Sequence, residues 1–135
     1  MRVLVDTGAL LALSRKRDQY HRRAIEIAER HLSSGGRYVG TTLILSELYS
    51  HFLYLRGPNG ARLALTRLLD DPVHEWLEVG PELVRSAITN WIGRFEDQRF
   101  SLVDAVSFEI MKVEKLARAF AFDRHFEVAG FQLLE

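Results

Sequence analysis

Hydrophobic residues along the chain form short apolar runs that alternate with longer amphipathic stretches. The apolar runs predict strands over residues 3–5, 38–40, 73–79, 119–122 and 131–134. The amphipathic stretches predict helices over residues 9–13, 18–33, 41–55, 61–70, 81–94 and 101–116. Strands that alternate with helices favour the α/β class. We therefore expect a three-layer sandwich, in which helices flank a mostly parallel, twisted sheet.

Local signals predict where the helices begin and end. Asp18 can cap the helix over residues 18–33, and Ser33-Ser34-Gly35-Gly36 stops it. The clearest interruption is Gly57-Pro58-Asn59-Gly60, which predicts a loop between two helices. Because neither side of this loop could bury a core alone, we expect a single domain over residues 1–135.

Composition and charge exclude several classes of protein. Hydrophobic residues make up 47% of the chain and charged residues 27%, which excludes a disordered chain. The 18 Lys and Arg residues balance the 18 Asp and Glu residues, so a site for a polyanion must be a local patch. The chain contains no cysteine, which excludes a disulfide framework, a thiolate zinc site and a cysteine nucleophile.

The first residues and the apolar runs bear on location. An acid follows the first apolar residues too early for the core of a signal peptide. No apolar run approaches the ~20 residues that a membrane helix needs. The lack of cysteine fits a reducing compartment. We expect a soluble, cytoplasmic protein that has no membrane partner.

Four carboxylates stand where the expected fold brings side chains to one edge of the sheet. Asp6 follows the first strand, and Asp123 follows the strand over residues 119–122. Glu47 and Asp104 lie near the N-terminal parts of two helices. Sites in α/β folds form beyond the carboxyl ends of the strands, near a topological switch point. The four carboxylates could therefore converge.

Taken singly, three of these acids have an ordinary structural interpretation. Asp6 and Asp123 could each cap the helix that follows. Ser101 and Asp104 have the spacing of a capping box, although Asp is a poorer third member than Glu or Gln. At each of these positions a cap is more common than a catalytic group.

Two of the acids are predicted to face the core. Asp104 lies in an apolar helix that we expect to pack deep in the sandwich. Glu47 falls on the apolar stripe of its helix, which consists of Ile44, Leu48, Phe52 and Leu55. A carboxylate turned toward a core is costly unless it is paired or binds a metal. Two such acids, together with two at strand ends, indicate one shared site.

The chemistry of a carboxylate cluster follows from its charge. Carboxylates held close together repel one another unless some are protonated or a cation lies between them. A ligand set made only of oxygen atoms selects a hard cation, Mg²⁺ or Mn²⁺. Such ions polarise a phosphodiester, lower the pKa of a bound water and stabilise the leaving oxygen. The cluster therefore predicts metal-dependent hydrolysis of a phosphoester.

The acidic motifs, in their order and spacing, resemble those of the PIN-domain nucleases, above all the small stand-alone VapC-type ribonuclease toxins. The similarity covers essentially the whole chain and rests on the segments 3–13, 41–48, 101–108 and 121–126. Each motif alone is weak, and the four together are specific. The resemblance implies a parallel sheet flanked by helices and a Mg²⁺- or Mn²⁺-dependent endoribonuclease. It also implies that the metal-binding, catalytic quartet is Asp6, Glu47, Asp104 and Asp123.

The resemblance also implies roles for individual residues and for partners. Asp6 and Asp104 would bind the metal directly, whereas Glu47 and Asp123 would bind directly, bind through water or position the nucleophile. The hydroxyl of Thr7 would support a metal-bound water, and a role in the turn and cap has equal weight. The family further suggests a homodimer and a cognate antitoxin, which would make the protein the toxin of a type II toxin–antitoxin pair.

Basic residues near the expected site are candidates for RNA contact. Three of them follow the first short helix, one follows Asp123 together with His125, and one precedes the helix of Asp104: Arg15, Lys16, Arg17, Arg124 and Arg99. The alternative is a solvated charged face, or pairing with an antitoxin. Asp97 is expected to be a loop acid.

Aromatic residues carry less information about function. We expect Trp76, Trp91 and the eight phenylalanines to belong to the core or to a dimer interface, and not to stack on bases. Residues 52–55 form a strip that suits a dimer, an antitoxin helix or the core equally well.

Several other functions remain to be weighed against a toxin nuclease. A receiver-like domain would need a lysine at the end of the strand over residues 119–122, which ends in Asp123-Arg124. The motifs of haloacid-dehalogenase phosphatases, nucleotide-binding domains and serine hydrolases are absent. Two alternatives keep the PIN-like fold. One is a ribonuclease of RNA processing or decay without an antitoxin, and the other is a catalytically silent scaffold that binds RNA or protein.

Overall fold

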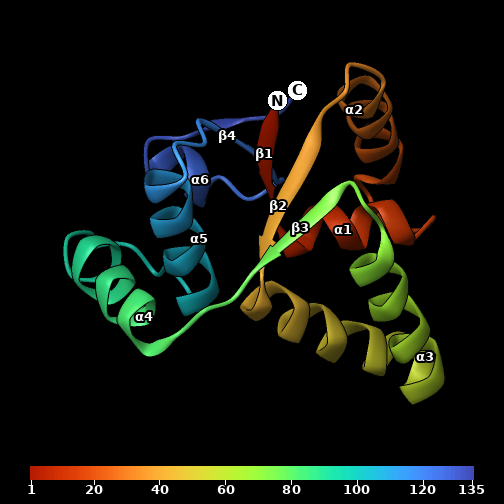
Figure 1. Cartoon of the computed structure of the whole chain (residues 1–135), viewed down its shortest axis with the longest axis horizontal. Helices are drawn as coiled ribbons and strands as arrows, with labels where there is room; N and C mark the ends of the chain where they lie inside the picture. The colour runs from red at the N-terminus through yellow and green to blue at the C-terminus, as the bar shows by residue number, and fades with distance from the viewer.

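A parallel five-stranded sheet forms the centre of the computed structural model, which describes all residues from 1 to 135 (Figure 1). Its strand order is β3-β2-β1-β4-β5, and every neighbouring pair is parallel. The sheet confirms the predicted α/β class. The strands are β1 (Arg2–Val5), β2 (Arg37–Thr41), β3 (His74–Leu77), β4 (Arg118–Phe120) and β5 (Gln132–Leu133).

Helices cover both faces of this sheet and complete the three layers (Figure 1). On one side lie α1 (Thr7–Ser14), α2 (His21–Ser33) and α3 (Thr42–Asp70). On the other side lie α4 (Pro81–Ala87), the π-helical turn η1 (Ile88–Ile92), α5 (Leu102–Val113) and α6 (His125–Val128). None of these helices combines the length and apolar character that crossing a membrane requires.

Successive side chains of the strands pack alternately into two separate hydrophobic cores. Val3 and Val5 pack on the side of α1, α2 and α3, whereas Leu4 between them packs on the side of α4 and α5. Tyr38 and Val39 of β2 divide in the same way. All five side chains are buried. Because both faces of the strands are covered, the strands appear in the sequence as continuous apolar runs.

The strand order places a topological switch point beside β1. From β1 the chain moves outward through β2 to β3, and then crosses to the other side of β1 to form β4 and β5. The backbone N–H of Asp6 donates to the carbonyl oxygen of Phe120 at 3.0 Å. This bond holds the carboxyl ends of β1 and β4 side by side, where a ligand site of an open α/β sheet forms.

Two predicted boundaries at this end of the molecule are wrong. Helix α2 begins at His21, because the carboxylate of Asp18 accepts the backbone N–H of Tyr20 at 2.8 Å and closes a turn before the helix. Strand β4 ends at Phe120, and the chain then leaves the sheet and forms α6, which the sequence did not predict. Both differences set the position of loops around the site.

The sequence predicted two helices joined by a loop over residues 57–60, and helix α3 consists of two helical halves joined by a shorter connection. It runs from Thr42 to Asp70 and departs from helical geometry only at Gly57, whose φ is 76° and ψ is 177°. Pro58 follows at once and suits the first position of the second half of the helix. The predicted loop is therefore a sharp kink made by one residue. This backbone conformation is open essentially only to glycine.

Replacing Gly57 by alanine tests the kink. A Cβ at Gly57 would meet no atom within 4 Å, so the whole cost is backbone strain, which is about 1–3 kcal/mol. We expect the melting temperature of Gly57→Ala, measured by circular dichroism, to fall by roughly 5–10 °C. Gly8→Ala is the control, because its new Cβ would lie 3.9 Å from Asp6 Oδ2 on a helical backbone. Equal melting temperatures for the two variants would contradict the assigned conformation.

Candidate active site

A cavity of about 620 Å³ opens at the carboxyl ends of β1 and β4. The four carboxylates that the sequence singled out all line it, although they come from four separate segments: Asp6, Glu47, Asp104 and Asp123. The cavity walls are mainly polar, since only three of the 15 lining residues are hydrophobic. The fold thus brings the predicted acids together at the predicted edge of the sheet.

Asp6 is the most deeply buried acid of the cavity. It has the backbone conformation of an N-cap before α1 and is 7% exposed, but its side chain makes no capping hydrogen bond. Burial raises the pKa of Asp6 from 3.8 to about 7, the charge of Asp104 adds to this rise, and Glu47 and Asp123 add less. The carboxylate of Asp6 therefore serves the cavity, and its predicted alternative as a helix cap is wrong.

Asp104 caps helix α5 and also lines the cavity. The hydroxyl oxygen of Ser101 accepts the backbone N–H of Asp104 at 3.0 Å, and Asp104 Oδ2 accepts the backbone N–H of Ser101 at 3.4 Å. This reciprocal pair is the predicted capping box. Helix α5 packs deep in the sandwich as predicted, since residues 105–111 are all buried, and the side chain of Asp104 at its N-terminal end is 13% exposed. The capping box holds it at the N-terminal end of α5, beside the cavity.

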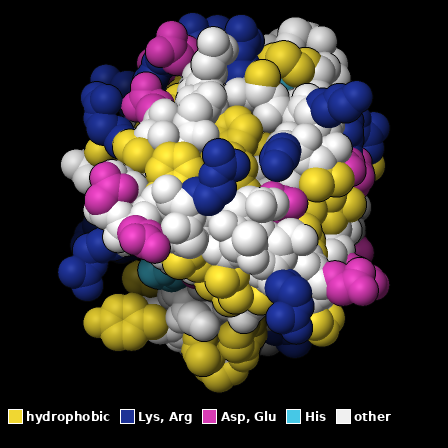
Figure 2. Space-filling model, turned by 90° about the vertical axis from the view of Figure 1, so that its left-hand side faces the viewer, with side chains coloured by type: hydrophobic (Ala, Val, Ile, Leu, Met, Phe, Trp, Pro, Cys, Tyr) yellow, Lys and Arg dark blue, Asp and Glu magenta, His cyan; other side chains and the backbone are white.

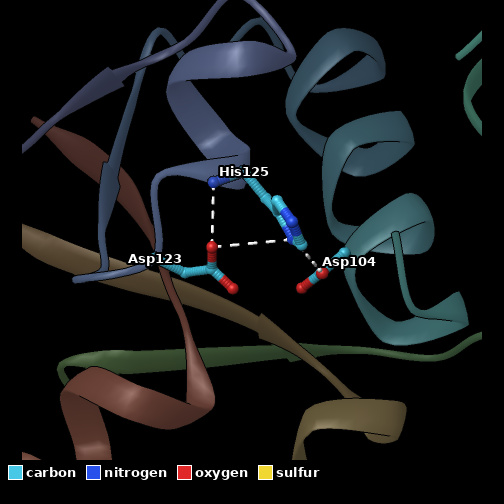
Figure 3. Close-up of side chains that lie close together, drawn as sticks. All are labelled: Asp104, Asp123 and His125. Carbon is cyan, nitrogen blue, oxygen red and sulfur yellow. Dashed lines mark hydrogen bonds and ion pairs between the residues drawn. The ribbon is translucent and has the colours of Figure 1, made fainter. Parts of the chain in front are cut away.

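His125 joins two of the acids, a contact that the sequence did not predict. Its Nδ1 lies 3.2 Å from Asp104 Oδ2 and 3.6 Å from Asp123 Oδ1, as the close-up shows (Figure 3). Its backbone N–H also donates to Asp123 Oδ1 at 2.8 Å. The ligand atoms of the three side chains all lie within 4.8 Å of one another. The one signal in the sequence was that His125 stands two positions after Asp123.

Glu47 lies at the border of the apolar stripe and not in it. Ile44, Leu48 and Phe52 are buried against the core, whereas Glu47 is half-buried and Leu55 is 36% exposed. The prediction that Glu47 faces the core is therefore wrong, as is the inclusion of Leu55. Neighbouring side chains on a helix point about 100° apart, so Glu47 points away from the buried Leu48 and toward the cavity.

The residues of the cavity fit a hard divalent cation. The carboxylates of the four acids and of Asp18 line the cavity, and carboxylates held close together repel one another without a counter-charge. Hydroxyls also line it, among them that of Thr7, which is 3% exposed and whose Oγ1 has no hydrogen-bond partner. A buried polar atom without a partner is costly. A water bound to a cation in the cavity would supply that partner.

Comparison with known proteins places this arrangement in a family. A family model described as PIN domain matches residues 3–132, nearly the whole chain. The chain belongs to the PIN-domain family. In sequence, this PIN domain is 42% identical over 41 residues to VapC20 of Mycobacterium tuberculosis, named as a 23S rRNA-specific endonuclease. That stretch covers 30% of this chain and 31% of the relative, so the sequence match spans about a third of VapC20.

Solved structures resemble this PIN domain over almost its whole length. The crystal structure of VapC20 of Mycobacterium tuberculosis, described as a sarcin–ricin-loop cleaving toxin, has a TM-score of 0.81 and 28% identity. The match covers 96% of this chain and 95% of the VapC20 chain. VapBC2 of Rickettsia felis, bound to a promoter DNA fragment, has a TM-score of 0.69 and 11% identity, covering 98% and 97%. FitAcB of Neisseria gonorrhoeae has a TM-score of 0.70 and 14% identity, and the match covers 100% of this chain and 97% of FitAcB. At this identity FitAcB and VapBC2 show the fold alone.

The predicted RNA-contact residues occupy three different places on the PIN domain. Arg99 lines the acidic cavity. Arg124 lines a separate hollow and pairs with Glu127 at 3.3 Å, its side chain being 86% exposed. A third group lines a shallow groove near the end of α1, together with Leu55 and Arg56: Arg15, Lys16 and Arg17. Only Arg99 of the five candidates therefore borders the four acids.

The face formed by α4, α5 and α6 carries no continuous basic surface. On this face lysine and arginine side chains are scattered among acidic and hydrophobic ones (Figure 2). Asp97, which is exposed, does not line the cavity, in agreement with a loop acid. This face therefore offers RNA no continuous basic surface.

The aromatic residues divide between the core and the cavity. Trp91 is 9% exposed and packs against Phe108 and Phe131, as predicted for a core residue. Phe122 lines the acidic cavity, where its ring stacks on that of Tyr20. Phe122 also packs against the core, as expected, so it belongs both to the core and to the cavity wall. Tyr20, in the loop before α2, gave no signal in the sequence.

Proposed function

We propose that this PIN domain is a Mg²⁺- or Mn²⁺-dependent endoribonuclease and the toxin of a type II toxin–antitoxin pair. One observation carries the proposal: four carboxylates line one cavity, where burial and the repulsion from the other acids raise the pKa of Asp6 to about 7. A divalent cation would replace the proton that this cluster otherwise retains. The similarity to VapC20, named as a 23S rRNA-specific endonuclease, supports RNA as the substrate and toxicity as the biological role.

The four acids would divide the binding of the cation among them. Asp6 and Asp104 would bind it directly, and Glu47 and Asp123 would bind directly or through water. When bound, the cation would polarise the phosphodiester and lower the pKa of the attacking water. Asp6 is rigidly placed because its backbone N–H is bonded to β4.

Residues around the acids would orient them and the substrate. His125 holds the carboxylates of Asp104 and Asp123 beside each other through its ring and its backbone N–H. The guanidinium of Arg99 is exposed at the cavity and would bind a phosphate of the RNA backbone. The Thr7 hydroxyl would hold a water at the metal. Arg124 and the group Arg15, Lys16 and Arg17 would contact RNA farther from the cavity.

The proposal extends to partners and location. A homodimer and an antitoxin need apolar surface, and the strip over residues 52–55 of helix α3 exposes several large hydrophobic side chains: Leu53 at 39%, Tyr54 at 91% and Leu55 at 36%. Co-expression of the protein with the product of an adjacent small reading frame, followed by co-purification, would test the antitoxin. Sedimentation would test the dimer. The proposed site of action is the cytoplasm, where RNA is present.

Cleavage of RNA by the purified protein tests the proposed function directly. The substrate is a pool of total RNA that includes 23S rRNA, incubated with Mg²⁺, with Mn²⁺ or with EDTA. We expect discrete products with either metal and none with EDTA. A folded protein that binds Mn²⁺ but cleaves no RNA under any condition would support a silent scaffold. Metal-dependent cleavage without growth arrest on expression would support RNA processing.

Replacing Thr7 by valine separates a structural role from a role at the metal. Valine has the shape of threonine and lacks the hydroxyl, which has no partner in the fold. Removing this unsatisfied group should leave the melting temperature in EDTA unchanged or slightly higher. Cleavage with Mg²⁺ should fall by roughly 10- to 100-fold, the usual loss when a group supporting a metal site is removed. Full activity of Thr7→Val would leave Thr7 with its turn and cap role only.

A further inference from the structure

Two aromatic rings form one wall of the acidic cavity. The rings of Tyr20 and Phe122 are parallel within 4°, and their centroids lie 4.5 Å apart. Tyr20 belongs to the loop between α1 and α2, and Phe122 belongs to the segment that follows β4. Both residues line the cavity together with the four carboxylates. The stack therefore joins two segments distant in sequence at the edge of the proposed active site.

The aromatic pair is supported from behind and accessible from the cavity. Phe122 packs edge-on against the fully buried Phe120, with centroids 6.1 Å apart. Asp18 fixes the backbone of Tyr20 by accepting its N–H at 2.8 Å. Phe122 is the only ring that contacts Tyr20, and Tyr20 is 42% exposed. Its ring thus has free area on a rigid support, which is what a stacking surface requires.

Apolar surface is scarce elsewhere in this cavity. Leu11 is the only other hydrophobic residue among the 15 that line it. An RNA strand whose phosphate lies at the acids brings flat bases into the same cavity, and their faces need an apolar or π surface. Gln19, exposed beside Tyr20, also lines the cavity and offers an amide that can donate to and accept from the edge of a base.

We infer that Tyr20, backed by Phe122, stacks on an unpaired base of the RNA next to the phosphate that is cut. A base can present its face to a protein ring only after it leaves its own stack, so the substrate class is single-stranded or looped RNA. Arg99 and the acids hold the backbone on the other walls of the cavity. This inference rests on the proposed ribonuclease function and adds the residue that selects unpaired nucleotides.

Substitutions of Tyr20 test the stack by steady-state cleavage of a short single-stranded RNA with one cleavage site. Tyr20→Ala should lower kcat/KM by about 5- to 150-fold, mainly through a higher KM. Tyr20→Phe keeps the ring and should stay within about 2-fold of the wild type. Tyr20→Leu keeps apolar volume without a π-face and should behave like Tyr20→Ala. The same RNA annealed to its complement should be cut at least about 10-fold more slowly by the wild type.

The matched control is Tyr49→Ala. Tyr49 is 40% exposed, close to the 42% of Tyr20, but it lies on α3 and does not line the cavity. Its loss should leave kcat/KM unchanged. Melting curves of all variants establish that they are folded. Folded Tyr20→Ala or Tyr20→Leu with wild-type kcat/KM, in an enzyme that does cleave RNA, would overturn the stack and leave the proposed function intact.

A binding measurement tests the stack even if the protein does not cleave RNA. The probe is a single-stranded RNA that carries 2-aminopurine, whose fluorescence falls when the base stacks. It is titrated with Asp6→Asn protein in Mg²⁺. We expect quenching that is retained in a Tyr49→Ala background and lost in a Tyr20→Ala background. Quenching that persists without the Tyr20 ring, or no quenching at all, would refute the inference independently of catalysis.

Discussion

Replacing Asp6 by asparagine should abolish metal-dependent RNA cleavage while the protein stays folded. Asn keeps the size of the side chain and removes the charge that, on the proposed function, binds the cation. Loss of a group that only supports a metal ligand typically costs 10- to 100-fold, so loss of a ligand should cost more than about 100-fold in kcat. The measurement is the initial rate on a defined RNA with Mg²⁺, with the fold checked by circular dichroism.

The control for this substitution is Asp97→Asn. It makes the same chemical change at an exposed loop position that does not line the cavity. Its rate should equal that of the wild type. If a folded Asp6→Asn protein kept full activity, the carboxylate cluster would not be the active site, and the proposed mechanism would be wrong even if the protein cleaves RNA.

The parts of this site that sequence predicted depend on local patterns. Asp6 ends an apolar run, and parallel strands align their carboxyl ends whatever their order in the sheet. The capping box of Ser101 and Asp104 is encoded within four consecutive residues. The position of Asp123 required only that a strand end shortly before it. Such features survive errors of two residues in a predicted boundary, as β4 demonstrates.

The parts that sequence did not predict depend on contacts between distant segments. Tyr20 and Phe122 meet only because the loop before α2 folds back to the end of β4. His125 reaches Asp104 only because the chain after β4 turns into α6, a helix of four residues too short to show a period. Proximity in sequence can also mislead. Arg15, Lys16 and Arg17 directly precede the cavity-lining residues 18–20, but they line a different groove.

The degree of burial was the least predictable property of the acids. Glu47 and Asp104 were expected to be the core-facing pair, yet Asp6 is the most buried of the four at 7% exposed. Periodicity assigns a residue to a helix face, but it does not show whether another element covers that face. Asp6 directly follows the central strand of the sheet, is bonded through its backbone to β4 and directly precedes α1, and this position buries it.

The burial of Asp6 leads to a second large effect, on the stability of the metal-free protein. The pKa of Asp6 is about 7 in the fold and near 3.8 when unfolded, so the folded state binds the proton more tightly between these values. The stability that this proton contributes is fully present below about pH 4 and is lost as the pH rises to about 7. A shift of this size corresponds to about 4 kcal/mol at most.

We therefore expect the melting temperature in EDTA to respond to Asp6 differently at pH 5 and at pH 8. At pH 8 the wild type holds Asp6 charged, facing Glu47, Asp104 and Asp123, and Asp6→Asn should melt roughly 10 °C higher. At pH 5 Asp6 is largely protonated in the fold but still ionised in the unfolded chain, so the gap should shrink to about 4 °C. The difference between the two proteins therefore reports the charge of Asp6 together with its repulsion from the other three acids.

Adding a divalent cation should narrow this gap in melting temperature at pH 8. Mg²⁺ or Mn²⁺ that binds only the folded wild type stabilises it by about 2.7 kcal/mol at a concentration 100 times its dissociation constant. Asp6→Asn, which lacks a ligand, should gain much less. The wild type would then approach the variant. The expectation would be contradicted if the difference in melting temperature in EDTA did not depend on pH, or if Asp6→Asn melted lower than the wild type at pH 8. Either result would show that the carboxylates do not repel one another in the metal-free fold.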